Sequence, residues 1–291
     1  MPRPRVAASF LIRLRGAPRV AIERLQYFAE AALEQLQGIS HLVLAGTKAP
    51  VSFFAYPDVP SLLVPEDCKA VPLSNPAEDT LSALAELADA VGADSTVKNR
   101  QTRIMPDMPE SGAIDPVKVW QIMARMMPEG AVLAEEAATS SFGADMFLGG
   151  AAPFEHLQLT GGSIGYGLPV AVGAAVACPD RKVICPHGDG GAMYTIQALW
   201  TMARDNLDVT TVIFANRSYA ILNIELMRVG AENPGRKALD MLDIGRPDLN
   251  FVQLAQGMGV EASRATTTEE FASQFESAMG QRGPRLIEVV L

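Results

Sequence analysis

From residue 115 to its end, the chain alternates between short apolar segments and segments with helical spacing. A helix is predicted for 116–126, because Asp115-Pro116 supplies an N-cap and a proline at the first helical position. Another follows the capping-box pair Thr267 and Glu270. The apolar segments resemble strands that are buried on both faces: 131–134, 183–185, 209–214 and 286–291. This alternation predicts an α/β fold with a doubly wound parallel sheet.

The first hundred residues carry a weaker α/β pattern. Residues 28–36 have helical spacing and 41–45 form a short apolar run, and a second helix face is expected at Leu81, Leu84, Ala85, Ala88 and Val91. The stretch 94–113 is polar and interrupted by prolines, which is typical of a linker. We therefore expect a partial Rossmann-like domain in residues 1–94, a linker in 95–113 and a second domain in 114–291.

Composition excludes several classes of protein. The net charge is −9 and the isoelectric point is near 4.9, which argues against nucleic acid as a partner. Three cysteines without a Cys-x-x-Cys pair indicate neither a disulfide framework nor a zinc site. No apolar run reaches the roughly 18 residues of a membrane span. The N-terminus is rich in arginine and faintly resembles a transit peptide, but the balance favours a cytoplasmic protein.

A glycine-rich turn, Gly188-Asp189-Gly190-Gly191, follows the predicted strand at 183–185. Glycines let a backbone approach a ligand closely, and the start of the following helix offers N–H groups to a phosphate. Asp189 adds a hard oxygen for a cation. The helix after the turn is expected to bury one face, formed by Ile196, Leu199, Trp200 and Ala203. The turn alone is a weak signal, since many tight turns contain these residues.

Asn216 makes the signal more specific, because it lies 27 residues beyond Asp189 and directly after the next predicted strand. A strand–helix–strand crossover of this length returns the chain beside its starting strand, so Asp189 and Asn216 are expected on neighbouring strand ends. A carboxylate, an amide oxygen and a backbone carbonyl, with two phosphate oxygens and a water, would complete the octahedron that Mg²⁺ prefers.

Gly188-Asp-Gly with Asn216 resembles the thiamine diphosphate signature of the superfamily that contains acetolactate synthase, benzoylformate decarboxylase and pyruvate oxidase. The resemblance covers residues from about 110 to the end, and more loosely the part before it, which is similar to the later part of the family's central domain. Flanking segments match in the same order: Glu135-Glu136, 159–165, 192–200 and 284–290. The resemblance implies the thiamine diphosphate-binding fold, with thiamine diphosphate and Mg²⁺ as cofactors.

The resemblance also assigns roles to individual residues. Asp189, Asn216 and the carbonyl of Ser218 resemble the Mg²⁺ ligands. The carbonyl of Gly162 would accept a hydrogen bond from the aminopyrimidine, and Ile164 matches the bulky residue that holds the cofactor bent, which makes these two the catalytic candidates. The diphosphate cradle would consist of Gly188, Gly190, Gly191 and the turn Ala138-Thr139-Ser140. The resemblance places Tyr219 at the cofactor. It places Ile221 and Glu225 at positions where the family lines its substrate pocket.

The implied activity is decarboxylation or carboligation of a 2-keto acid, by a cofactor whose thiazolium carbanion is the reactive group. Ala215 stands where the family often has a second asparagine, and a tryptophan typical of acetolactate synthases is missing downstream. Family members are about twice this length, and their pyrimidine-binding domain supplies an activating glutamate. We therefore expect a homo-oligomer, or a partner chain that carries that domain. The alternative is a non-catalytic cofactor-binding or assembly subunit, or an inactive remnant.

Three further residues and one other fold have weaker support in the sequence. His187 precedes the glycine turn and is interpreted as a structural or solvated residue. Glu135 and Glu136 fit a solvated pair and an active-site pair equally well. A Rossmann dehydrogenase is disfavoured, since the glycines of 161–167 lack the spacing of the G-x-G-x-x-G fingerprint. The substrate, the product and any bound flavin stay open.

Overall fold

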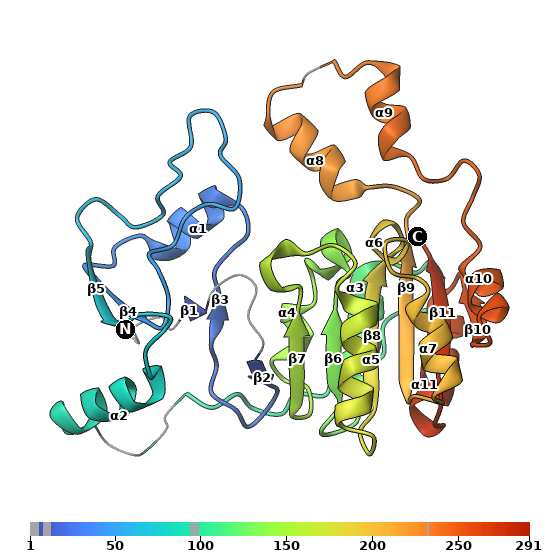
Figure 1. The fold of residues 1–291 in the computed structure, drawn as a ribbon, viewed down its shortest axis with the longest axis horizontal. Helices are drawn as coiled ribbons and strands as arrows, with labels where there is room; N and C mark the ends of the chain where they lie inside the picture. The colour runs from blue at the N-terminus through green and yellow to red at the C-terminus, as the bar shows by residue number, and fades with distance from the viewer. Residues whose placement is uncertain (1–5, 8–12, 94–95, 97–98, 232) are drawn as a thin grey trace. The chain divides into compact units, whose positions relative to one another are not determined.

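The computed structural model describes residues 6–7, 13–93, 96, 99–231 and 233–291 (Figure 1). Met1–Arg5 of the arginine-rich start, and 94–95 and 97–98 around the expected linker, lie outside the described residues. The chain divides into two compact units. The first contains 1–9 and 22–99, and the second contains 10–21 and 100–291.

The first unit is small and mixed α/β. Its parallel strands β4 (His41–Ala45) and β5 (Lys69–Ser74) form one pair, and β1 (Val6–Ala7) and β3 (Glu23–Arg24) form another. A modest core gathers under α1 (Ala29–Leu36), around Leu25 and Leu63. Helix α2 (Thr80–Ala90) forms where its spacing predicts it, but none of its residues is buried.

The second unit is built on a seven-stranded sheet in the order β10-β11-β9-β8-β6-β7-β2. Six strands run parallel, as the alternation of strands and helices predicts, and only β2 (Arg13–Arg15) is antiparallel, against β7 (Phe154–Gln158). The parallel strands β6, β8, β9, β10 and β11 are Val132–Glu135, Val183–Gly188, Val209–Ala215, Glu261–Ala265 and Arg285–Val290. All seven residues of β9 are buried, which explains its continuous apolar sequence.

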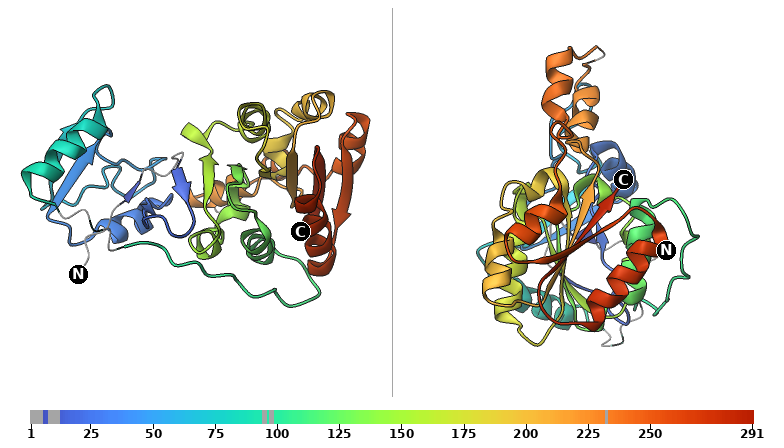
Figure 2. Two further views of the ribbon diagram at one scale, coloured as in Figure 1. Left: turned by 90° about the horizontal axis from the view of Figure 1, so that it is seen from below. Right: turned by 90° about the vertical axis from the view of Figure 1, so that its right-hand side faces the viewer.

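Helices cover both faces of this sheet (Figure 2). One core joins it to α3 (Pro116–Met126), α4 (Asp145–Leu148) and α11 (Thr268–Gly280). The other joins it to α5 (Gly167–Ala177), α7 (Ala198–Arg204) and α10 (Phe251–Gly257). Successive residues of a strand alternate between the cores, so Val183 and Cys185 enter one and Ile184 the other.

The predicted caps are confirmed, and one predicted core residue is wrong. Asp115 accepts a hydrogen bond from the N–H of Lys118, and Thr267 with Glu270 forms the capping box. Leu199 is buried as expected, but Trp200 is exposed and lies under the guanidinium of Arg204. The ring points outward because α7 has a single buried face, and an apolar residue next to that face need not enter it.

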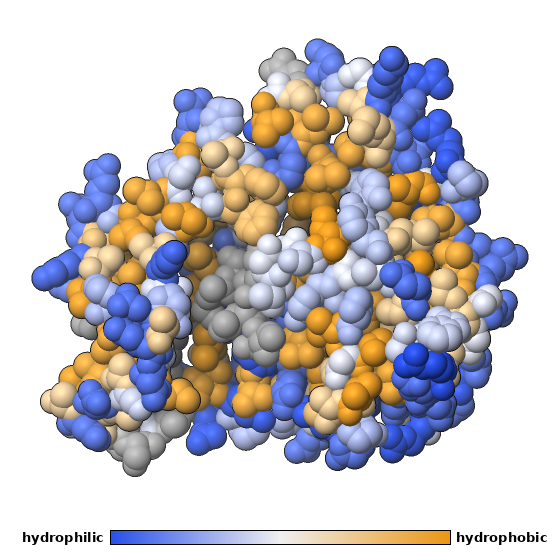
Figure 3. Space-filling model, viewed as in Figure 1, coloured by the Kyte–Doolittle hydropathy of each residue, from blue (hydrophilic) through white to orange (hydrophobic). Residues whose placement is uncertain are grey.

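Helices α8 (Ala220–Arg228) and α9 (Arg236–Leu242) form a hairpin that stands away from the sheet (Figure 1). Neither helix has a buried residue. Apolar side chains gather over α8 near the top of the space-filling view (Figure 3), and Leu222 and Met227 are among the exposed ones.

Within the described residues, no helix has both the length and the apolar character needed to cross a membrane.

Leu133→Ala should lower the free energy of unfolding of the second unit by about 2–5 kcal/mol, because Leu133 is buried in β6 and its removal leaves a cavity. Leu222→Ala, on the exposed face of α8, should change it by no more than about 0.5 kcal/mol. Urea unfolding followed by circular dichroism measures both variants. Equal losses would contradict the assigned core.

Candidate functional site

The candidate site lies where the order of the strands reverses. After β6 the chain passes to β7 on one side, and after β8 it passes to β9 on the other. The connections that leave β6 and β8 enter opposite cores, because α4 contributes to one and α7 to the other. The carboxyl ends of these two strands therefore border a crevice, the usual ligand position in a doubly wound sheet.

Asp189 begins α6 (Asp189–Ala192) directly after β8 and is buried (3% exposed). Its Oδ1 accepts a hydrogen bond from the N–H of Gly190 at 2.8 Å, and its Oδ2 accepts one from the N–H of Arg217 at 2.6 Å. Burial raises the pKa of Asp189, and these N–H groups act in the opposite direction. The carboxylate thus links the end of β8 to the turn after β9.

The turn after β9 brings Asn216 and Ser218 to the same edge of the sheet. Strands β8 and β9 pair in parallel, with Gly188 opposite Phe214, so the prediction that Asp189 and Asn216 lie on neighbouring strand ends is confirmed. Asn216 Oδ1 accepts a hydrogen bond from the N–H of Ser218 at 3.0 Å. Between these residues Arg217 has a left-handed φ of 57°, which folds the chain back toward Asp189.

These oxygens suit a hard divalent cation. The hydrogen bonds that the Asp189 carboxylate accepts come from backbone N–H groups, and the guanidinium of Arg217 pairs instead with Asp248 at 2.7 Å. The described residues contain no group of three His, Cys, Asp or Glu side chains that could hold a metal by themselves. A carboxylate, an amide and a carbonyl leave further positions for phosphate oxygens, so this donor set fits Mg²⁺ held jointly with a diphosphate.

Gly190 and Gly191 are glycines because of packing. A Cβ on Gly190 would lie 2.5 Å from the ring of Tyr219, and one on Gly191 would lie 2.9 Å from Glu136 Oε1. A Cβ on Gly188 would meet only ordinary contacts. The side chains of Tyr219 and Glu136 therefore exclude any larger residue at these two positions.

The turn Ala138-Thr139-Ser140 forms the 3₁₀ helix η1 (Ala138–Ser141) after β6. Ala138 is exposed with a φ of 50°, Thr139 is half-buried and Ser140 is buried. The carbonyl of Ser140 accepts a hydrogen bond from Trp120 Nε1 at 2.6 Å. The first two residues of the turn are thus available to a ligand, and the third anchors it to α3.

The loop that carries Gly162 and Ile164 follows β7. It starts with the short helix η2 (Thr160–Gly162), and Gly161, Gly162 and Gly165 have positive φ values of 66°, 69° and 88°. Ile164 is 53% exposed, which suits a side chain that supports a ligand.

The two acidic residues that the sequence left undecided are both buried. Glu135 accepts hydrogen bonds from the N–H of Ala137 at 3.0 Å and from Ser141 Oγ at 2.6 Å, so it holds η1. Glu136 accepts from the N–H groups of Gly165 and Gly167, both at 2.6 Å. His187 is fully buried beside Glu136, which agrees with the structural interpretation. A single sequence does not reveal that these carboxylates accept hydrogen bonds from backbone N–H groups, because every residue except proline has such a group.

The proposed substrate residues Ile221 and Glu225 are half-buried on α8. A pocket of about 300 Å³ lies beside the turn after β9, and Ser218, Asn223 and Leu239 help to line it. Ile221 and Glu225 are not among its lining residues. Their assignment to a substrate pocket stays a prediction.

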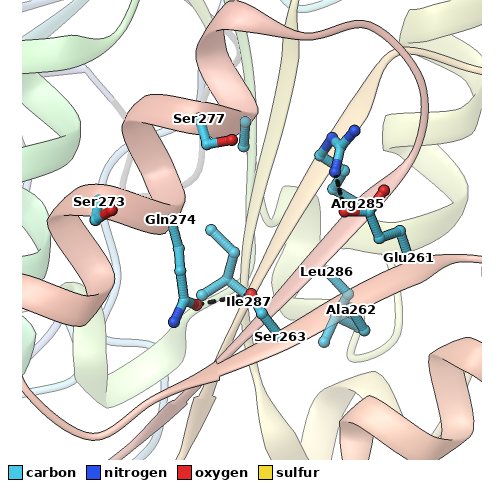
Figure 4. A pocket seen from close by; sticks show the side chains of 10 residues that line it. Glu261, Ala262, Ser263, Ser273, Gln274, Ser277, Arg285, Leu286 and Ile287 are labelled. Atoms are coloured by element: carbon cyan, nitrogen blue, oxygen red, sulfur yellow. Dashed lines mark hydrogen bonds and ion pairs between the residues drawn. The ribbon is translucent and has the colours of Figure 1, made fainter.

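A second pocket, of about 290 Å³, lies between α11 and the beginnings of β10 and β11 (Figure 4). These are the amino ends of parallel strands, opposite the crevice. Two pairs of polar groups meet at its lining, since Arg285 pairs with Glu261 at 2.5 Å and Ser263 Oγ donates to Gln274 at 2.7 Å. It shares no residue with the candidate site.

A buried polar cluster supports η1 from the side of β7. His156 Nε2 lies 3.7 Å from Glu135 Oε2, and His156 Nδ1 lies 3.4 Å from the guanidinium of Arg15, which pairs with Asp145 at 2.6 Å. Burial lowers the pKa of His156 to about 4, and Glu135 only partly opposes this. The imidazole is therefore neutral at pH 7 and helps to fill the space behind Glu135.

Residues 147–289 match the family described as the C-terminal TPP-binding domain of thiamine pyrophosphate enzymes. The match includes the Gly188 turn, Asn216 and the loop with Gly162 and Ile164. The C-terminal part of this chain therefore belongs to the thiamine pyrophosphate (thiamine diphosphate) enzyme family, as its sequence signature predicts.

Two curated relatives show which enzymes of this family the chain is similar to. The chain is 51% identical to IlvX of Mycobacterium tuberculosis, whose name places it with acetolactate synthase large subunits, over 95% of this chain and 53% of that protein. It is 33% identical to benzoylformate decarboxylase of Pseudomonas aeruginosa over 62% of this chain and 33% of that protein. The chain thus spans about half, or less, of the curated relatives it matches.

Solved structures agree on the fold. A thiamine diphosphate-dependent 4-hydroxybenzoylformate decarboxylase from Rhodococcus jostii RHA1 superposes with a TM-score of 0.72 at 27% identity, over 91% of this chain and 51% of that one. A benzoylformate decarboxylase from Polynucleobacter necessarius superposes with a TM-score of 0.70 at 22% identity, over 90% and 51%, and supports the fold alone.

Acid should destabilise the protein through His156. Its pKa is about 4 when folded and 6.5 ordinarily, so between pH 7 and 5 only the unfolded chain takes up the proton. The free energy of unfolding should fall by about 2 kcal/mol from this residue. Urea unfolding at both pH values should show this loss in the wild type and not in His156→Gln. The control His41→Gln, at an exposed position, should lose as much unfolding free energy between pH 7 and 5 as the wild type. An unchanged pH dependence in His156→Gln would contradict this assignment.

Proposed function

We propose that this chain is the diphosphate-binding component of a thiamine diphosphate- and Mg²⁺-dependent enzyme that decarboxylates or ligates 2-keto acids. The observation that carries the proposal is the link from the buried Asp189 to the turn of Asn216 and Ser218, at the switch point of the sheet. The membership of residues 147–289 in the thiamine pyrophosphate enzyme family supports it. Decarboxylation and acetolactate synthesis are both named among the relatives, so the proposal keeps both reactions.

In this proposal, the side chains of Asp189 and Asn216 and the carbonyl of Ser218 hold Mg²⁺. The backbone at Gly188, Gly190 and Gly191 and the turn of Ala138, Thr139 and Ser140 receive the diphosphate. The carbonyl of Gly162 orients the aminopyrimidine, Ile164 supports the bent cofactor, and Tyr219 closes the site over Gly190. When bound, the cofactor would supply the nucleophilic carbon that the chemistry of a 2-keto acid requires.

This chain's own residues bind and orient the cofactor. The buried position of Asp189 excludes water from its carboxylate, and the N–H bonds to that carboxylate fix the direction in which it would meet Mg²⁺. The glutamate that activates the aminopyrimidine in the family belongs to the pyrimidine-binding domain. Residues 1–291 resemble only later parts of that family, so we assign this role to a pyrimidine-binding domain outside these residues. We place Ile221 and Glu225 near the 2-keto acid.

Asp189→Asn should weaken Mg²⁺-dependent binding of thiamine diphosphate at least about 10-fold, because an amide replaces the carboxylate at the cation. Calorimetric titration of the full chain, with Mg²⁺ and with a chelator, measures this. Asp205→Asn is the matched control, since Asp205 is an exposed residue paired with Arg204. Equal metal-dependent affinity in Asp189→Asn and the wild type would refute the assigned ligands.

The catalytic part of the proposal has its own assay. Release of CO₂ from pyruvate or benzoylformate should be absent or slow with this chain alone. It should rise when a pyrimidine-binding domain from a related enzyme is added. Steady turnover by the chain alone would contradict the need for a partner. Cofactor binding without turnover in either mixture would instead support a non-catalytic cofactor-binding subunit.

A further inference from the structure

Glu136 connects segments of the site that lie far apart in the sequence. It follows β6, is 3% exposed, and accepts hydrogen bonds with both oxygens. Its Oε1 receives the N–H of Gly165 and its Oε2 the N–H of Gly167, each at 2.6 Å. The loop 161–167, which carries Gly162 and Ile164, is therefore tied to the end of β6 by one side chain.

The other side of this carboxylate faces the glycine turn after β8. His187 Nε2 lies 3.0 Å from Glu136 Oε2, and His187 Nδ1 lies 2.9 Å from the carbonyl of Gly188. A Cβ on Gly191 would come within 2.9 Å of Glu136 Oε1 and 3.0 Å of the His187 ring. One on Gly167 would come within 2.8 Å of the same ring. The carboxylate and the imidazole thus fill the space between the loop 161–167 and the turn 188–191.

We propose that Glu136, seated against His187, is a positioning residue that fixes the distance between the loop 161–167 and the turn 188–191. The inference rests on the proposed function in one respect. The loop is assigned to the aminopyrimidine end of thiamine diphosphate and the turn to its diphosphate end, so their separation sets the span that one cofactor molecule bridges.

The loop needs such a support because its own sequence does not fix its shape. Three of its residues are glycines with positive φ, and glycine populates many backbone conformations at little cost. Bonds from a buried carboxylate to two N–H groups are stronger than bonds between neutral groups. Holding the loop before the ligand arrives avoids the entropy of ordering it on binding.

The test compares a ligand that spans both segments with one that reaches only the turn. Glu136→Gln keeps the size of the side chain, and hence its packing on Gly191, but directs an NH₂ group at one of the two backbone N–H groups. In calorimetry on the full chain with Mg²⁺, thiamine diphosphate should bind at least about 10-fold more weakly. Inorganic diphosphate should keep its affinity within about twofold, because the cation ligands and the turn are unchanged.

Hydrogen exchange gives a readout that does not depend on the cofactor. Peptides that cover 163–168 should exchange faster in Glu136→Gln than in the wild type, since the N–H groups of Gly165 and Gly167 lose an acceptor. Glu135→Gln is the matched control. Glu135 is an equally buried neighbour whose bonds go to Ala137 and Ser141, so exchange in 163–168 should be unchanged. If Glu136→Gln does not fold, Glu136→Asp keeps the charge but is too short to reach both N–H groups, and the same pattern is expected.

Equal loss of affinity for both ligands would show a general structural defect and would overturn the proposal, and so would unchanged exchange in 163–168. If the wild type binds neither ligand, the proposed function fails, yet the exchange data still decide whether Glu136 holds the loop. Faster exchange in Glu136→Gln, together with a selective loss of affinity for thiamine diphosphate, supports both the proposed function and the positioning role of Glu136.

Discussion

The parallel pairing of β6, β8 and β9 is the constraint on which the rest of the second unit depends. Parallel strands present their carboxyl ends at one edge, so a residue that follows one strand meets residues that follow its neighbours. The reversal of strand order between β6 and β8 sends the two following segments to opposite faces and leaves their first turns side by side. Among the non-glycine residues of the site, only Ala138 and Arg217 have a positive φ, which turns the chain sharply at both places.

Buried acids at this edge act mainly as acceptors for the backbone. Asp189, Glu135 and Glu136 each receive N–H groups from turns that have no regular hydrogen-bond partner of their own. Turns that expose backbone to a ligand cannot satisfy it within a helix or a sheet, and an unsatisfied buried N–H group costs about 1–3 kcal/mol. A carboxylate resolves this problem compactly, because its two oxygens can accept two N–H groups, as those of Glu136 do.

Much of the fold could be predicted from the sequence because periodicity and caps are local signals. The helix 116–126, the strands around 183–188 and 209–215, and the Asp189–Asn216 neighbourhood all follow from spacing and crossover length. The roles of Glu135 and Glu136 could not be predicted, since their partners are backbone groups that any residue would supply. The exposed Trp200 shows the limit of a helical pattern, which marks an apolar stripe but not its exact width. The antiparallel β2 carried no signal, because three residues are too few for a pattern.

That short strand makes the second unit discontinuous along the chain. Arg13–Arg15 completes the edge of the sheet on β7 and sends Arg15 to His156 and Asp145, although some eighty residues of another compact unit follow before the chain returns at Arg100. A gene segment that encodes only residues 100–291 would therefore lack one strand of its own domain and a buried cation. A recombination or fusion that exchanges the first unit has to preserve both 10–21 and 100–291. A single cut in the gene therefore cannot separate the two folded units.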